Sequence, residues 1–204
     1  MHGLGMFDKI LQFEQALADY TGAPYVVMTD CCTHAIELCF RYERVKSCVF
    51  TPFTYLSVPM LMHRLGVHYN YLQFAEQWVG EYEFYGTRIF DSARRLERNM
   101  YHTGRMQCLS FGHDKPLQLG GGGAILLDDR KAYDTLIRLR YDGRDLNISP
   151  WQDQKVFQVG YHYRPTPEQA MLGLERLAQF QLHDHRPVFK QYPDLRKIQI
   201  REQL

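Results

Sequence analysis

The sequence predicts an α/β fold, because short apolar segments of strand length alternate with helical segments along the chain. Turn residues separate the two kinds of segment, and side chains able to bind an anion follow directly after several of the strands. Sheets of this kind bind their ligands at the carboxyl ends of the strands, so a functional site is expected at that edge. The predicted strands are residues 25–28, 47–50, 67–72, 87–90, 107–111 and 123–127.

The predicted helices carry start and stop signals of their own. Apolar side chains recur at near-helical spacing in residues 6–20, and the turn Thr21-Gly22-Ala23-Pro24 ends that pattern. Thr166, Pro167 and Gln169 have the spacing of a capping box with proline at the first helical position, so another helix starts there. The remaining helices are expected at residues 33–42, 55–65 and 132–141, and residues 147–160 are expected to form a loop.

Composition narrows the class of partner. The 204 residues are 45% hydrophobic and 14% aromatic, which favours a globular protein with one medium-sized domain. The formal net charge of +1 gives no sign of a basic surface for nucleic acid. The sequence also contains no run of about 18 apolar residues, the length that could cross a membrane. A small molecule or a protein is therefore the expected partner.

The cysteines and histidines give no metal-site pattern. Five cysteines include the adjacent pair Cys31 and Cys32, and none shows the paired spacing of zinc ligands. Reduced thiols in a cytoplasmic protein are the simplest account. His183, Asp184 and His185 could suggest a metal site, but solvated side chains are expected in this polar segment, so no metal is predicted.

The most informative segment contains Lys115. This lysine follows Ser110 by five residues and precedes four consecutive glycines, Gly120 to Gly123. A lysine amine can form a Schiff base with an aldehyde, while a serine hydroxyl and exposed backbone amides can hold a phosphate. The segment suits a cofactor with both groups, although by itself it fits a solvated loop lysine beside a flexible turn equally well.

Two further positions belong to the same predicted site. Asp91 places a carboxylate at the end of a strand, and Asp30-Cys31-Cys32-Thr33 leads from a strand into a helix start. The first amides of a helix have no partner within the helix, and the helix dipole favours an anion there. A carboxylate and an anion-binding turn are therefore expected at the same sheet edge as Lys115.

Taken in order, several segments resemble the pyridoxal-phosphate-dependent sugar aminotransferases of the DegT/DnrJ/EryC1/StrS group. The resemblance implies the PLP-dependent transferase fold of type I, which is aspartate-aminotransferase-like, with pyridoxal 5'-phosphate (PLP) as the cofactor. It covers mainly the large, cofactor-binding domain of that fold. The matching segments are residues 13–22, 31–36, 52–55, 90–94, 110–123 and 160–170.

The resemblance implies a role for each matching residue. Lys115 would hold the cofactor as a Schiff base and then move a proton between substrate and cofactor, while Asp91 would pair with the pyridine nitrogen. The ring of Tyr55 would stack on the pyridine ring. The cofactor phosphate would be bound by Cys32, Thr33 and Ser110.

The chain departs from the pattern of this group at four positions. Cys32 replaces a glycine, which is tolerable only if the backbone there needs no positive φ, and Gly121 replaces a glutamate. Arg94 stands where a glutamine or histidine would contact the phenolic oxygen of the cofactor, so a cation there would change the cofactor's electronics. His162 replaces an asparagine that reaches the phosphate of a neighbouring subunit, which implies a homodimer with a shared active site.

The leading prediction is an enzyme, a PLP-dependent aminotransferase that moves an amino group from an amino acid, with glutamate expected, to a nucleotide-linked keto-sugar for polysaccharide biosynthesis. Residues 1–182 would form a reduced PLP-binding domain, and residues 183–204 a loosely packed polar tail in place of most of a smaller domain. Two alternatives remain open: another PLP-dependent reaction on a different amino or keto compound, such as dehydration, and a non-catalytic homologue that serves as a binding or assembly subunit.

Overall fold

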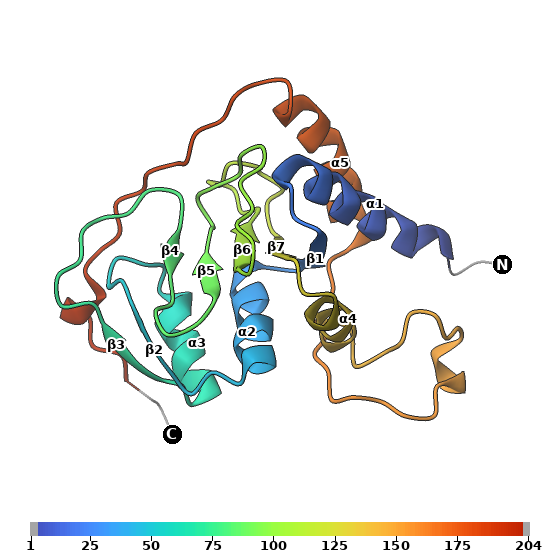
Figure 1. The fold of residues 1–204 in the computed structure, drawn as a ribbon, viewed down its shortest axis with the longest axis horizontal. Helices are drawn as coiled ribbons and strands as arrows, with labels where there is room; N and C mark the ends of the chain where they lie inside the picture. The colour runs from blue at the N-terminus through green and yellow to red at the C-terminus, as the bar shows by residue number, and fades with distance from the viewer. Residues whose placement is uncertain (1–3, 202–204) are drawn as a thin grey trace.

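The computed structural model in Figure 1 describes residues 4–201 as a layered α/β structure. The helices are α1 (Leu4–Thr21), α2 (Cys32–Glu43), α3 (Ser57–Leu65), α4 (Arg130–Leu139) and α5 (Pro167–Phe180), with short 3-10 helices η1 (Trp151–Asp153) and η2 (Leu195–Lys197). The strands are β1 (Tyr25–Thr29), β2 (Ser47–Phe50), β3 (His68–Tyr71), β4 (Tyr82–Glu83), β5 (Ile89–Asp91), β6 (Met106–Ser110) and β7 (Gly123–Leu127).

The main sheet has five strands in the order β1-β7-β6-β5-β4, and β2 pairs with β3 in a separate parallel ribbon. Strands β5 and β6 are parallel, whereas β7 runs antiparallel to both of its neighbours, β1 and β6. Thr29 and Ser110 each pair with Gly123. The carboxyl ends of β1, β5 and β6 therefore share one edge of the sheet with the amino end of β7.

Helices cover both faces of this sheet (Figure 1). Alternate strand residues point to opposite faces, as the pleat requires. Val27, Cys108 and Ile125 belong to a buried cluster with α2, α3 and α4, whereas Val26 and Leu126 belong to a second cluster with α1 and α5. This two-sided burial explains why the strands read as continuous apolar runs in the sequence.

A buried ion pair ties three elements together beneath the sheet edge. Glu14 of α1 and Arg140, which caps the end of α4, pair in the interior. Glu14 also accepts a hydrogen bond from the Met28 amide at 2.7 Å, and Arg140 donates to the Met28 carbonyl at 2.6 Å. Removing one partner would leave the other buried and unpaired, which typically costs about 3–5 kcal/mol.

The elements predicted from the sequence are confirmed, with end shifts of one or two residues. The capping box of α5 is present in full, with Gln169 N donating to Thr166 Oγ1 and Thr166 N donating to Gln169 Oε1. Strand β4 was not predicted, because its two residues are too few to show a period. No helix within residues 4–201 is both long enough and apolar enough to cross a membrane.

The chain after α5 runs back to the β4 end of the sheet and on past β3 (Figure 1). We call residues 182–197 the strap. The expectation of loose packing is wrong at Tyr192 and Leu195, which are buried. Backbone bonds hold the strap, with Val188 N donating to Arg94 O at 2.8 Å and Leu195 N to Pro52 O at 3.1 Å. The division into a domain at residues 1–182 and a tail at 183–204 stays a prediction.

Candidate active site

A cavity of about 410 Å³ lies at the edge where β1, β5 and β6 end. It brings together residues that are far apart in the sequence, and it adds a hydroxyl from α3 and two side chains from the strap. The residues predicted from the sequence that line it are Cys32, Thr33, Tyr55, Asp91, Ser110 and Lys115, and the lining residues not predicted include Ser57, Asp114, Lys190 and Tyr192.

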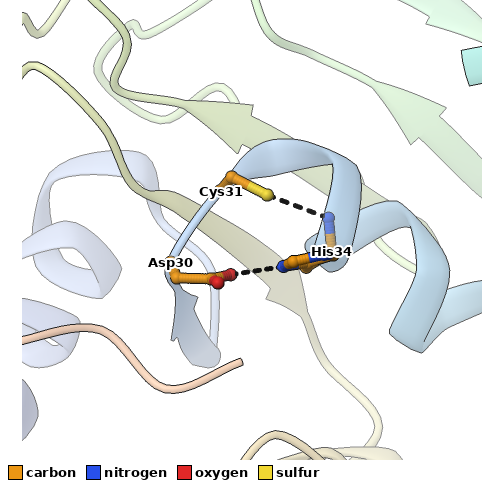
Figure 2. A group of neighbouring side chains, drawn as sticks. All are labelled: Asp30, Cys31 and His34. Carbon is orange, nitrogen blue, oxygen red and sulfur yellow. Dashed lines mark hydrogen bonds and ion pairs between the residues drawn. The ribbon is translucent and has the colours of Figure 1, made fainter. Parts of the chain in front are cut away.

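The turn from β1 into α2 presents the start of a helix to this cavity. Cys31 caps the helix in an extended conformation, and its Sγ accepts a hydrogen bond from His34 N at 3.4 Å (Figure 2). Cys32 is the first residue of α2 with helical backbone, so the condition for replacing glycine is met. The Thr33 and Ser57 hydroxyls lie 2.7 Å apart, and both line the cavity. Helix amides and two hydroxyls thus form a surface suited to a phosphate.

Asp30 and His34 brace the same turn, as Figure 2 shows. His34 Nδ1 lies 2.7 Å from Asp30 Oδ1, and the imidazole stacks on Tyr163 with ring centroids 3.7 Å apart. Burial alone would lower the pKa of His34, but its hydrogen bonds with Asp30 and Cys31 outweigh burial and raise the pKa to about 9. His34 is therefore an imidazolium at neutral pH, paired with the Asp30 carboxylate.

We expect the pair of Asp30 and His34 to stabilise the fold at neutral pH and to stop doing so in alkali. The folded-state pKa of His34, about 9, lies above the ordinary 6.5, so the stabilisation is complete below pH 6.5 and is lost as the pH rises through 9. NMR titration of the imidazole should give a midpoint near 9, and Asp30→Asn should lower that midpoint. A wild-type midpoint at the ordinary value would contradict the pairing.

The glycine run is a close contact between β7 and the start of α2. Gly122 has φ +103°, and its amide donates to the Asp30 carbonyl at 2.9 Å. A Cβ on Gly123 would lie 2.5 Å from the Cys32 amide nitrogen and 2.6 Å from the Cys31 carbonyl carbon. The alternative of a flexible turn is therefore wrong at Gly122 and Gly123, because these residues pack the turn from β1 into α2 against the sheet.

We expect Gly123→Ala to lower the free energy of unfolding by about 1–3 kcal/mol, the usual cost of overpacking. The Cβ would meet backbone atoms of Cys31 and Cys32, which cannot move without displacing the start of α2. Urea unfolding measures the change. Gly112→Ala is the matched control, because its Cβ would lie in ordinary contact, 3.5 Å from Lys115 Cγ. Equal stabilities of the two variants would show that the turn is not held by this contact.

The loop after β6 folds back so that Ser110 and Lys115 are neighbours. The Lys115 amide donates to the Gly112 carbonyl at 3.3 Å, which closes a turn. A Cβ built on Gly112 would lie 3.5 Å from Lys115 Cγ and 3.9 Å from Ser110 Oγ, so the three residues surround one point. The spacing of five residues therefore directs one hydroxyl and one amine into the same cavity.

Asp91 is a buried carboxylate held by a chain of hydroxyl groups. Its Oδ2 accepts from the Tyr82 hydroxyl at 2.9 Å, its Oδ1 accepts from the Ala93 amide at 3.0 Å, and Tyr82 Oη lies 2.7 Å from Thr54 Oγ1. Burial raises the pKa of Asp91, opposed by the Ala93 hydrogen bond and by the charge of Lys115. Burial also raises the pKa of Tyr82 well above its usual range, so Tyr82 remains a donor that fixes the carboxylate.

Cys32 contributes a thiol that stays protonated. Burial raises its pKa well above the usual range, and the charge of Asp91 adds to the shift. The Sγ donates to the Cys108 carbonyl at 3.6 Å, which orients the thiol along the sheet edge. The thiol is therefore no nucleophile, and a contact through the backbone amide is the chemistry that this residue offers.

Arg94 forms an ion pair with Asp114 and does not line the cavity. Its Nη2 donates to Asp114 Oδ2 at 2.6 Å, and its Nη1 donates to the Asp114 carbonyl. Lys190 of the strap joins the same carboxylate, with Nζ 2.5 Å from Oδ2. The hydrogen bond from Lys190, followed by those from Arg94, holds the pKa of Asp114 well below its usual range. In this position Arg94 fixes the loop that carries Lys115, which differs from the predicted contact with a cofactor.

Tyr55 lines the cavity, whereas His162 lies outside it. Tyr55 lines the cavity with 64% of its surface exposed, so its ring is free to stack on a ligand. The His162 side chain is 72% exposed and lies outside the cavity, with its Nδ1 3.0 Å from Asp142 Oδ2. A contact of His162 with the phosphate of a neighbouring subunit stays a prediction.

Besides Asp114, four residues of the site were missed in the sequence. Ser57 lies inside the predicted helix at residues 55–65, where the pattern gave it no role, and Tyr82 was one of 14 tyrosines. Lys190 and Tyr192 reach the cavity only because the strap returns across the sheet. Ser57 could have been identified because it follows the predicted strand 47–50 closely. No local signal marks Tyr82, Lys190 or Tyr192.

The donor set fits pyridoxal phosphate. The start of α2 with Thr33, Ser57 and Ser110 suits the phosphate, and the absence of a side chain at Gly123 lets this turn lie close against β7. The Lys115 amine suits the aldehyde, and the buried Asp91 carboxylate suits a protonated ring nitrogen. All of these groups line one cavity.

The chain is similar in sequence or in fold to several known proteins. The chain is 30% identical over 76 residues to GDP-perosamine synthase of Escherichia coli O157:H7, an alignment that covers 37% of this chain and 20% of that protein. NtdA of Bacillus subtilis, solved with bound pyridoxamine phosphate, superposes with a TM-score of 0.71 at 20% identity, covering 85% of this chain and 48% of that one. GDP-4-keto-6-deoxymannose-3-dehydratase, solved with GDP-perosamine, gives a TM-score of 0.68 at 15% identity, covering 86% and 62%.

The solved structures are similar in fold, and the chain spans about half to three-fifths of their length and about a fifth of the GDP-perosamine synthase. The sequence pattern of one family matches residues 3–77 and 92–194, which is most of the chain. The segment between these ranges holds β4 and β5, where Tyr82 and Asp91 meet. The chain belongs to the DegT/DnrJ/EryC1/StrS aminotransferase family.

Proposed function

We propose that this chain is a PLP-dependent aminotransferase that transfers an amino group from an amino acid, glutamate first among the candidates, to a nucleotide-linked keto-sugar. The observation that carries the proposal is the convergence of Lys115, Asp91 and Ser110 on one cavity beside the start of α2. Membership of the family supports the reaction class. The names of the GDP-perosamine synthase and of the dehydratase solved with GDP-perosamine support a sugar nucleotide as the acceptor.

In this proposal the start of α2 and its hydroxyls bind and orient the phosphate. Thr33, Ser57 and Ser110 donate hydrogen bonds, and the helix dipole favours the negative charge. The Asp30–His34 pair and the glycine contact keep this turn from moving. These groups would thus hold a phosphate in the same cavity as Lys115.

Asp91 and Lys115 divide the proton chemistry between them. Bound PLP supplies a positively charged ring that accepts the electrons released when a proton leaves the substrate. Asp91 keeps the proton on the ring nitrogen, because Tyr82 and Ala93 fix the carboxylate in the buried position. The Lys115 amine would remove a proton from the substrate α-carbon and deliver it to the cofactor carbon that carried the aldehyde, and Tyr55 would cover one face of the site.

An absorbance experiment tests this function. Purified protein supplied with PLP should show a visible band, and glutamate should convert that band to one at shorter wavelength as the amino group is transferred. A screen of keto-sugar nucleotides should then identify an acceptor that restores the visible band. A band that no amino acid changes would contradict transamination.

Two observations support a second reaction of the same site. A structural neighbour is named a dehydratase, so this fold serves elimination of water as well as amino transfer. Gly121 stands where the family pattern has glutamate, and Gln169 Nε2 lies 3.3 Å from the position of a Cβ there. Mass analysis of the sugar product distinguishes the two reactions, because dehydration leaves no new nitrogen in it.

We propose that the protein is a homodimer in which His162 contacts the cofactor phosphate bound by the neighbouring subunit. His162→Ala should weaken retention of the cofactor by about tenfold or more, because a hydrogen bond to an anion is lost, while the dimer persists. Equilibrium dialysis measures retention, and sedimentation measures the dimer. A stable monomer that holds the cofactor at full occupancy would refute the shared site.

A further inference from the structure

The strap covers one side of the cavity with two side chains that the proposed function leaves unused. Lys190 and Tyr192 line the cavity together with Lys115 and Tyr55. Neither belongs to the groups that suit the phosphate or the ring nitrogen. They are also the part of the site that is furthest along the chain, 75 and 77 positions after Lys115.

The strap is fixed in place at Tyr192. The Tyr192 amide donates to Gln77 Oε1 at 3.1 Å, and Gln77 Nε2 donates to the Tyr192 carbonyl at 2.8 Å. The phenol ring stacks on Trp78 with centroids 5.7 Å apart, and Trp78 in turn packs edge-on against Tyr82. Tyr192 is therefore connected through Trp78 to the tyrosine that orients Asp91, and Lys190 is held two residues away.

The charges around Lys190 leave one cation in excess. Lys190 shares a single carboxylate, that of Asp114, with Arg94. Arg94 is buried, binds Asp114 through two groups and does not line the cavity, whereas Lys190 lines it and is partly exposed. An ammonium group has three donors, and the contact with Asp114 uses one. Lys190 is therefore able to bind a second anion from the cavity side.

We propose that Lys190 binds the carboxylate of the amino-acid substrate, with the Tyr192 ring forming the wall beside it. The choice of an amino acid rests on the proposed function. A carboxylate is favoured over a diphosphate because a cavity of about 410 Å³ lies near the lower end of ligand sites, roughly 300–1,000 Å³, and the cofactor must share it. The strap would thus complete the substrate side of the site.

Calorimetric titration with glutarate, which has the carboxylates of an amino-acid donor but no amine, tests this subsite. With PLP-loaded protein, Lys190→Gln should raise the dissociation constant of glutarate about tenfold or more, because a charge-assisted hydrogen bond is lost. Lys190→Arg should retain most of the affinity. Lys197→Gln is the matched control, since it removes one positive charge from the strap at a residue that does not line the cavity.

Two results would overturn the assignment. An unchanged dissociation constant in Lys190→Gln, with a lowered melting temperature, would show that Lys190 only fastens the strap to Asp114. A Lys190-dependent affinity for pyrophosphate without one for glutarate would assign the subsite to a phosphate group instead.

Failure of the Lys190 subsite and failure of the proposed function give different experimental results. Protein that holds no PLP but binds glutarate in a Lys190-dependent way would refute the cofactor and leave the subsite in place. Protein that transaminates glutamate with the same glutarate affinity in wild type and Lys190→Gln would refute the subsite alone.

Discussion

Replacement of Lys115 by alanine should give a folded protein that has lost its visible absorption band and, to the order of 10³-fold or more, its transamination rate. Among the residues that line the cavity, Lys115 is the lysine whose side chain lies beside both Ser110 and the turn at Gly112. The side chain is partly exposed, so its removal leaves no cavity in the core. The band is measured by absorbance and the rate by conversion of glutamate.

Lys131→Ala is the control for that substitution, because Lys131 is an exposed lysine on α4 outside the cavity. It should leave band and rate unchanged. Survival of the band in Lys115→Ala, with an adduct that borohydride fixes, would move the covalent attachment to another amine. Lys190 would then be the residue to examine, since it also lines the cavity.

Asp91→Asn should leave the cofactor bound and slow the half-reaction with glutamate by the order of 10²–10³-fold. A neutral amide cannot keep a proton on the ring nitrogen, so the electron sink is weakened. The shape of the side chain is kept, and the Tyr82 hydroxyl can still bond to it. Stopped-flow absorbance after mixing with glutamate measures the rate.

Tyr82→Phe is the companion variant for Asp91, because it removes a hydrogen bond to the carboxylate and leaves the charge. It should slow the half-reaction less than Asp91→Asn does. An unchanged rate in Asp91→Asn would place the partner of the ring nitrogen on another residue.

The fold could be predicted largely from local patterns. Apolar runs identified six strands, and the capping residues Thr166 and Gln169 identified the start of α5. The position of Asp91 and Ser110 at strand ends was enough to place them at one edge, since β5 and β6 are parallel. These features are readable because each depends on residues that are close in the sequence.

The rest depends on contacts between distant segments. The antiparallel run of β7 between β1 and β6 follows from pairing that no local pattern records. Arg94 matched a cofactor-binding position, yet Asp114, 20 residues later, provides a carboxylate that holds the guanidinium away from the cavity. Lys190 and Tyr192 reach the site because Gln77 and Trp78 hold the strap there. The polar composition of the strap gave no indication that Tyr192 and Leu195 would be buried.

We infer that Lys115 holds the cofactor in a site built by Asp91, Thr33 and Ser110. This assignment is tested most directly by incubating the wild-type protein with PLP, reducing with borohydride, digesting, and locating the labelled residue by mass spectrometry. We expect one label per chain, on Lys115, and the loss of this label when glutamate is added before the reduction. A label on another lysine, or no label at all, would contradict it.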